Sequence, residues 1–204
     1  MDIAQPLLAL SLRRPIFHSE ADFQHELAWE IRRCLPDCEV RLERPHSDGQ
    51  LGATDIVILQ RGVSHGIELK YCTKGFEGRI AEENFRLKAH GAQDLRRYDV
   101  CKDIYRLEMF NKRHCGTSTM LLLTNDAAYW AQNSAENLCD ADFRISSGRE
   151  LAGILRWADH TSAGTKKGRE FDIPLANRYF LNWQDYSDVS GRGGQFRFLR
   201  IDIP

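Results

Sequence analysis

Three charged residues interrupt two short stretches of the chain that are otherwise apolar. Asp55 lies near the start of the β-branched run 54–59, and Glu68 and Lys70 lie within the run 67–71. Both runs are typical of β-strands, and because side chains alternate along a strand, Glu68 and Lys70 share one face. An unpaired charge in a buried sheet costs several kcal/mol. These three residues are therefore the first candidates for chemistry.

The chemistry that these residue types favour is metal-assisted hydrolysis. Two carboxylates a few ångströms apart repel each other unless a cation lies between them. Carboxylate oxygens suit Mg²⁺, which binds through one or two carboxylates and keeps several waters. An ammonium group such as that of Lys70 can position a water or stabilise the charge that develops on a scissile phosphate. Asp55, Glu68 and Lys70 thus predict hydrolysis of phosphodiester bonds with Mg²⁺, or with Mn²⁺ in its place.

The motif resembles the signature of the PD-(D/E)XK nuclease superfamily. Asp55 precedes Glu68-Leu69-Lys70 by thirteen positions (68 − 55 = 13), and Thr54 stands where the family usually has proline. The resemblance covers about residues 19–126. It implies an α/β fold with a restriction-endonuclease-like core, in which helices flank a mixed central β-sheet. We expect one domain over 1–204, with a β-rich C-terminal decoration over about 143–204.

The same resemblance implies further site residues. Members of this superfamily often take another metal-binding glutamate from the first helix of the core, and Glu20 is our first choice, with Glu26 and Glu30 as alternatives. Gln93 is similar to a glutamine that follows the catalytic strand and contacts a phosphate or the catalytic water. The tyrosine that accompanies it lies four residues on, whereas Tyr98 lies five residues on (98 − 93 = 5), so we expect Tyr98 to be a core aromatic.

Hydrophobic periodicity predicts the elements that position these residues. Ser19 is a good N-cap for a helix over about 20–33. Two strand-like runs across a short glycine-containing connection predict an antiparallel hairpin. The remaining expectations are a strand over 38–44, a loop over 45–50, a mobile loop with a short helix over 73–90, a long helix over 92–113, a buried strand over 117–123, a helical tendency over 127–135 and a strand over 195–201.

The charges exclude a globally basic protein, because 28 Lys+Arg residues stand against 29 Asp+Glu. Residues 61–114 nevertheless carry twelve basic and eight acidic side chains, and binding through such a cluster is sensitive to salt. On the predicted long helix, Asp99, Asp103 and Glu108 read as members of ordinary surface ion pairs. The basic residues that we expect to contact nucleic acid are Lys74, Arg79, Arg86, Lys88, Arg96 and Arg97.

The six cysteines show no repeated CxxC spacing, so we expect reduced thiols in a cytoplasmic protein and no zinc site. No run of about 18 apolar residues is present, and a membrane partner is not expected. The expected partner is nucleic acid, DNA rather than RNA. The resemblance also allows a homodimer, and a separate protein that selects the target. The alternative is a non-catalytic module on the same fold that binds nucleic acid or protein.

Overall fold

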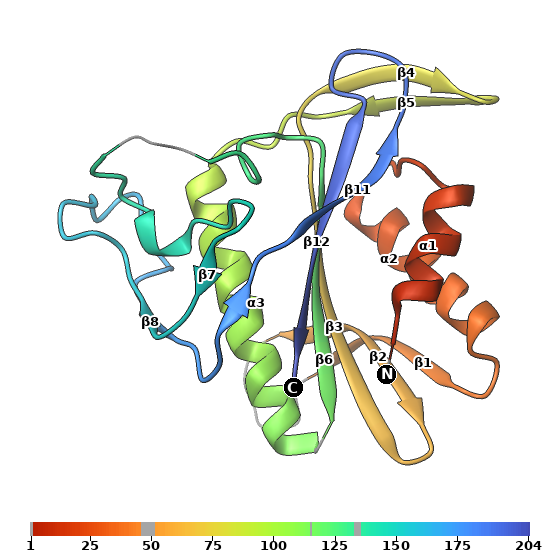
Figure 1. Ribbon diagram of the computed structural model, residues 1–204, viewed down its shortest axis with the longest axis horizontal. Coiled ribbons are helices and arrows are strands. Elements are labelled where there is room, and N and C mark those ends of the chain that lie inside the picture. The colour runs from red at the N-terminus through yellow and green to blue at the C-terminus, as the bar shows by residue number, and fades with distance from the viewer. Residues whose placement is uncertain (1, 46–51, 115, 133–135) are drawn as a thin grey trace.

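The computed structural model describes residues 2–45, 52–114, 116–132 and 136–204. Its centre is a six-stranded sheet with helices on both faces (Figure 1). The helices are α1 (Ala4–Arg13), α2 (Glu20–Cys34), α3 (Gln93–His114) and the short 3-10 helix η1 (Ala141–Phe143). The strands are β1 (Glu39–Pro45), β2 (Ala53–Gln60), β3 (Val63–Cys72), β4 (Phe76–Ile80), β5 (Glu83–Leu87), β6 (Thr117–Thr124), β7 (Glu150–Leu151), β8 (Ile154–Leu155), β9 (Ile173–Pro174), β10 (Tyr179–Phe180), β11 (Trp183–Asp188) and β12 (Gln195–Ile203).

The main sheet has the order β1-β2-β3-β6-β12-β11. Only β3 and β6 pair in parallel, and the other neighbours are antiparallel. A parallel pair needs a long crossover, and α3 forms part of the connection that provides it. The predicted mixed sheet with flanking helices, including the antiparallel β2–β3 hairpin, is therefore confirmed.

Each face of the sheet has its own apolar core. Helices α1 and α2 cover one face, where Phe23 and Leu27 pack with Ile67 and Leu69. Helix α3 covers the other face together with the C-terminal region, where Leu107 packs with Met120 and Leu122. Because side chains alternate along a strand, residues at odd positions of β3 pack in the first core. Those at even positions face α3.

Most predicted elements of the first two thirds of the chain are present at nearly their expected bounds. The Ser19 hydroxyl accepts a hydrogen bond from the Asp22 N–H at 3.1 Å, so α2 begins where the capping signal placed it. Of the predicted loop over 45–50, residue Pro45 ends β1, and residues 46–50 lie outside the described residues.

Two predictions about irregular regions are wrong. The segment 73–90 contains the antiparallel hairpin β4–β5 instead of a loop with a short helix, because Phe76, Phe85 and Leu87 alternate with exposed residues and bury one face. The described part of 127–135 forms turns instead of a helix. There the Asp126 carboxylate caps a single turn, closed by a hydrogen bond from the Ala131 N–H to the Ala127 carbonyl at 2.9 Å, and one turn alone does not provide enough hydrogen bonds to sustain a helix.

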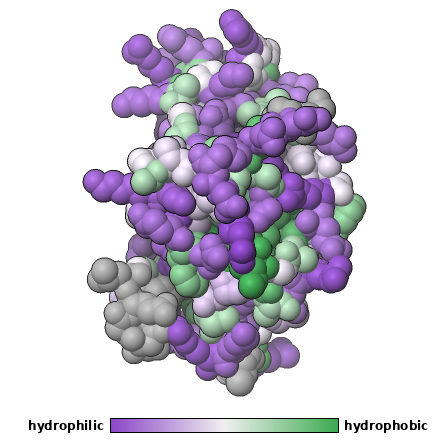
Figure 2. Space-filling view, turned by 90° about the vertical axis from the view of Figure 1, so that its left-hand side faces the viewer, coloured by the Kyte–Doolittle hydropathy of each residue, from purple (hydrophilic) through white to green (hydrophobic). Residues whose placement is uncertain are grey.

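The C-terminal third is more than a decoration. Strands β11 and β12 extend the main sheet, while the short pairs β7–β10 and β8–β9 lie outside it. Figure 2 shows the side of the molecule that carries β7 and β8, where hydrophilic residues surround a small hydrophobic area. No helix in the described ranges is long and apolar enough to cross a membrane.

Hydrogen bonds to Glu108 join the C-terminal region to helix α3. The side chain of Glu108 is buried and accepts hydrogen bonds from the backbone N–H groups of Ala176 and Asn177 and from the Tyr179 hydroxyl at 2.7 Å. The expectation of an ordinary surface ion pair for Glu108 is wrong. Removing this carboxylate leaves several buried donors without an acceptor, which is costly.

Glu108→Ala should lower the free energy of unfolding by about 3 kcal/mol, because alanine keeps the helix but leaves these donors unpaired. Urea denaturation measures the change. Glu108→Gln is the matched control, since its amide oxygen can still accept and should retain a large part of the stability. A Glu108→Ala variant as stable as the wild type would show that this carboxylate does not hold the C-terminal region in place.

Candidate functional site

The candidate site lies where β2 separates from β3. The β2–β3 ladder ends at the pair Ile56↔Ile67, whereas β3 runs on to Cys72 and stays paired with β6 as far as Thr124. Past Ile67, one edge of β3 has therefore lost its neighbouring strand. Backbone N–H groups on such an edge need other acceptors if they are shielded from water.

Two carboxylates provide these acceptors. Asp55 Oδ2 accepts a hydrogen bond from the Leu69 N–H at 2.7 Å, and Glu20 Oε2 accepts one from the Tyr71 N–H at 2.7 Å. Glu20 is the first residue of α2, so the start of this helix is fixed against the end of β3. The sequence prediction that Asp55 and Glu20 belong to one site is consistent with this geometry.

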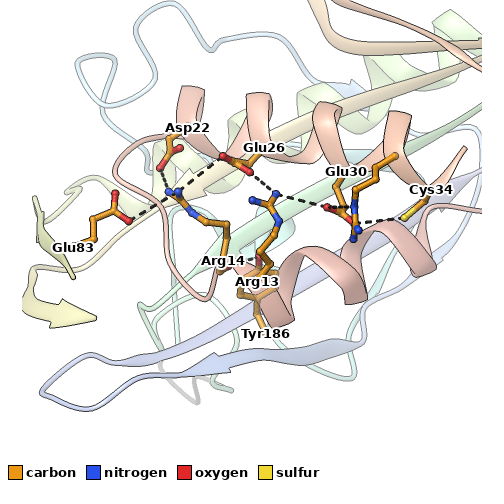
Figure 3. Close-up of polar contacts among 9 residues, drawn as sticks. Arg13, Arg14, Asp22, Glu26, Glu30, Cys34, Glu83 and Tyr186 are labelled. Atoms are coloured by element: carbon orange, nitrogen blue, oxygen red, sulfur yellow. Dashed lines mark hydrogen bonds and ion pairs between the residues drawn. The ribbon is translucent and has the colours of Figure 1, made fainter. Parts of the chain in front are cut away.

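The other two candidate glutamates of α2 lie away from β3. Glu26 pairs with Arg13 at 2.5 Å, and Glu30 is fully buried and pairs with Arg33 at 2.6 Å. Figure 3 shows both carboxylates in the layer of ion pairs between α1 and α2. Of the three alternatives, Glu20 is the one that contacts β3.

Glu68 and Lys70 share one face of β3, as their two-residue spacing predicts. That face packs against α3, where both residues meet charged partners. Lys70 Nζ lies 2.9 Å from Asp103 Oδ2, and Arg106 lies 3.1 Å from Glu68 Oε1 and 2.9 Å from Asp103 Oδ1. Asp103 is only 4 % exposed, so its expected role in an ordinary surface ion pair is wrong.

Sequence reasoning missed Asp103 and Arg106 as members of the site, although a signal for Asp103 is present. The buried residues Val100, Ile104 and Leu107 form the apolar stripe of α3. Asp103 follows Val100 by three positions and precedes Leu107 by four, so it lies on that stripe. A carboxylate within a buried helical stripe needs a partner, and here the partners are Lys70 and Arg106.

The cluster carries more negative than positive charge. Four carboxylates against two cations leave a formal charge of −2 when all six groups are ionised. It opens to solvent on one side, because Glu20 is exposed, Asp55 and Lys70 are half-buried, and Glu68 and Asp103 are buried. The six members are Glu20, Asp55, Glu68, Asp103, Lys70 and Arg106.

The pKa values of the carboxylates reflect their burial and, for Glu68 especially, this excess of negative charge. Burial raises the pKa of Asp55 to about 6, although the Leu69 N–H and the Lys70 ammonium act in the opposite direction. Burial, followed by repulsion from Asp103 and Asp55, raises the pKa of Glu68 well above its usual range. Burial alone would lower the pKa of Lys70, but the Asp103 carboxylate beside it raises that pKa.

Two buried oxygens of the cluster, Glu68 Oε1 and Asp103 Oδ2, have an ion-pair neighbour but no hydrogen bond of good geometry. Within the described residues, no three His, Cys, Asp or Glu side chains are arranged as a ready metal site. The hard oxygen donors and the formal charge of −2 nevertheless suit a divalent cation. The assignment of Asp55, Glu68 and Glu20 as its ligands stays a prediction.

The remaining predicted site residues lie in different surroundings. The Gln93 amide donates to Asp126 Oδ2 at 3.0 Å, and no contact with the cluster is found for it in the described residues. Tyr98 is a core aromatic, as expected, with its hydroxyl on the Phe171 carbonyl. Arg97 was expected to contact nucleic acid, but its side chain is buried.

The guanidinium of Arg97 is ion-paired with Asp140 at 2.5 Å, which leaves it unable to reach a ligand on the surface. The guanidinium of Arg79 is exposed and pairs with Glu82 three residues on, and Lys74 is exposed beside Asn125. The other three basic candidates, Arg86, Lys88 and Arg96, line one cavity together with Glu20.

Comparisons of the chain with protein-family models, with curated proteins and with solved structures found no match.

Asp55→Asn should stabilise the metal-free protein above about pH 6. The folded-state pKa of Asp55 is raised from 3.8 to about 6. The stability that the protonated carboxyl group gives the folded state is complete below pH 3.8 and is lost as the pH rises through 6, where the buried group must ionise. Asparagine can still accept from the Leu69 N–H but carries no charge. The gain should be at most about 3 kcal/mol near pH 7.5 and should vanish near pH 4.

Thermal unfolding in EDTA at both pH values measures this difference. Glu26→Gln serves as the control, because it removes a carboxylate that is paired with Arg13 and should bring no gain at either pH. An Asp55→Asn midpoint at or below that of the wild type at pH 7.5 would contradict the raised pKa.

Proposed function

We propose that this chain is a metal-dependent nuclease of the PD-(D/E)XK type that hydrolyses phosphodiester bonds in DNA. In this proposal, the sheet and its helices form a restriction-endonuclease-like core. The observation that supports it most is the convergence of Asp55, Glu68 and Lys70, with Glu20 from α2, beside the unpaired edge of β3.

The carboxylates of Asp55, Glu68 and Glu20 would hold Mg²⁺ or Mn²⁺. When bound, the ion supplies Lewis-acid activation of a water and of the phosphate. Lys70 contributes a fixed positive charge next to the phosphate, where negative charge develops during hydrolysis. Asp103 forms an ion pair with the Lys70 ammonium at 2.9 Å and so keeps it charged and close to the cluster.

The choice of DNA rests on the family resemblance of the motif, and so do the proposals of a homodimer and of a partner protein that selects the target. Both would concern surfaces outside the cluster. The chemistry proposed for Lys70 and the carboxylates is the same for DNA and RNA, because both share the phosphodiester group.

A second candidate function is a non-catalytic binding module on the same fold. It is favoured by one observation: Glu68 and Asp103 already have cationic neighbours in Arg106 and Lys70. In such a module these ion pairs would only fasten α3 to β3. The two functions differ in whether a divalent ion binds and whether Lys70 is needed for cleavage.

Lys70→Ala and Asp55→Ala should each reduce cleavage by at least about 100-fold, because each removes a group that stabilises the transition state. The assay offers duplex DNA, single-stranded DNA and RNA with Mg²⁺ or Mn²⁺. The control is Glu26→Gln. Glu26 lies on α2, as Glu20 does, but outside the cluster, so this variant should cleave at the wild-type rate. If Lys70→Ala cleaves as fast as the wild type, the nuclease assignment is wrong.

Mg²⁺ should raise the thermal unfolding midpoint of the wild-type protein, because a ligand that binds only the native state stabilises it. At about 100 times the dissociation constant the gain is about 2.7 kcal/mol. The Asp55→Asn variant should lose this metal-dependent gain, whereas Glu26→Gln should keep it. An unfolding midpoint that does not respond to millimolar Mg²⁺ or Mn²⁺ would favour the binding module.

A further inference from the structure

A cavity of about 350 Å³ adjoins the acidic cluster. It lies between the residues that begin α2, strand β5 and the first turn of α3. Glu20 and Tyr71 belong to its wall, and these two residues also form the hydrogen bond that fixes α2 against the end of β3. The cavity and the candidate metal ligands therefore share one carboxylate.

Three basic side chains line this cavity, those of Arg86, Lys88 and Arg96. Across the described ranges, none of the three side chains makes an ion pair or a hydrogen bond with the protein. Their neighbour Arg97 differs, because it is buried against Asp140. Among the described residues of the wall, Glu20 is the one acidic group, so their formal charge is +2 before any histidine is protonated.

His90 adds a neutral donor to the same wall. Its Nδ1 atom lies 3.0 Å from the Thr73 backbone N–H, and a ring nitrogen that accepts from an N–H carries no proton. The proton of the neutral ring is therefore on Nε2, which can donate to an anion. Burial, followed by the charge of Arg96, lowers the pKa of His90 and keeps it neutral.

The outer wall is held in place by the β4–β5 hairpin. The His18 ring stacks on Phe85 with centroids 4.4 Å apart, and its Nε2 atom lies 2.7 Å from Glu83 Oε1. These contacts join the hairpin to the residue that precedes the N-cap of α2. Arg86 on β5 and Lys88, which directly follows β5, are thereby kept in the same wall region as Arg96 of α3.

We propose that this cavity binds a phosphodiester group of the DNA. This group is the neighbour, along the same strand, of the phosphodiester group that is cleaved. The proposal rests on the nuclease function argued above and adds a substrate-binding subsite to it. Guanidinium and ammonium groups are the usual protein partners of phosphate oxygens. Apart from Leu87 and Tyr71, the lining residues carry polar or charged side chains, and the excess of positive charge among them favours an anionic phosphate.

The test is a binding measurement in EDTA, where a metal-dependent nuclease cannot cleave. Fluorescence anisotropy follows a labelled DNA duplex of about 20 base pairs between about 50 and 200 mM NaCl. The variant is Arg86→Ala/Arg96→Ala. Arg32→Ala is the matched control, because Arg32 is an exposed arginine of α2 without an ion pair in the described residues.

Because the cavity is proposed to bind one phosphate, losing that contact should make the slope of log K against log salt shallower by about 0.9. The control should keep the wild-type slope, and the thermal midpoints of both variants should match the wild type. A double variant that keeps the wild-type slope, or a wild type that does not bind the duplex at low salt, overturns the proposal.

The cavity and the nuclease function can fail separately. If Lys70→Ala still cleaves but the double variant loses salt-dependent binding, the subsite stands and the catalytic assignment falls. If Lys70→Ala loses cleavage while the double variant keeps both the wild-type slope and the wild-type KM, the nuclease stands and the subsite falls. A double variant with raised KM and unchanged kcat supports both.

Discussion

The separation of β2 from β3 is the constraint on which the site depends. A strand that loses its neighbour leaves backbone N–H groups without acceptors, and a buried donor without an acceptor is costly. Here the carboxylates of Asp55 and Glu20 accept the backbone hydrogen bonds that a neighbouring strand would otherwise accept. The hydrogen bonds that complete the fold are therefore the same ones that bring two acidic groups from separate elements to the end of β3.

Helix α3 completes the electrostatics from the opposite side. Asp103 and Arg106 contact the two even-numbered charged residues of β3, so one ion-pair network joins helix and sheet. The network does not neutralise the cluster, and burial together with repulsion between the carboxylates raises the pKa values of Asp55 and Glu68. A purely structural network gains stability from balanced charges, whereas an excess of buried carboxylate is typical of sites that bind a cation or a substrate.

The sequence predicted the parts of this arrangement that follow from local periodicity. The two-residue spacing places Glu68 and Lys70 on one face, and the Ser19 cap fixes where α2 begins. Local periodicity does not predict contacts between distant elements. The pairing of Asp103 with Lys70 depends on how α3 crosses β3. Likewise, β12 joins the main sheet by pairing with β6, which is far from it in the sequence. The sequence did not predict the β4–β5 hairpin, because its two strands are only five residues long and contain few apolar residues among many charged ones.

Crystals soaked in Mn²⁺ would show whether the acidic cluster binds a divalent ion, because anomalous scattering locates the ion independently of any activity. If the carboxylates form a metal site, one anomalous peak will lie in contact with carboxylate oxygens of Asp55 and Glu68, on the side open to solvent at Glu20. A structure without such a peak, in which Glu68 still contacts Arg106 and the carboxylates are otherwise unchanged, would contradict this metal site.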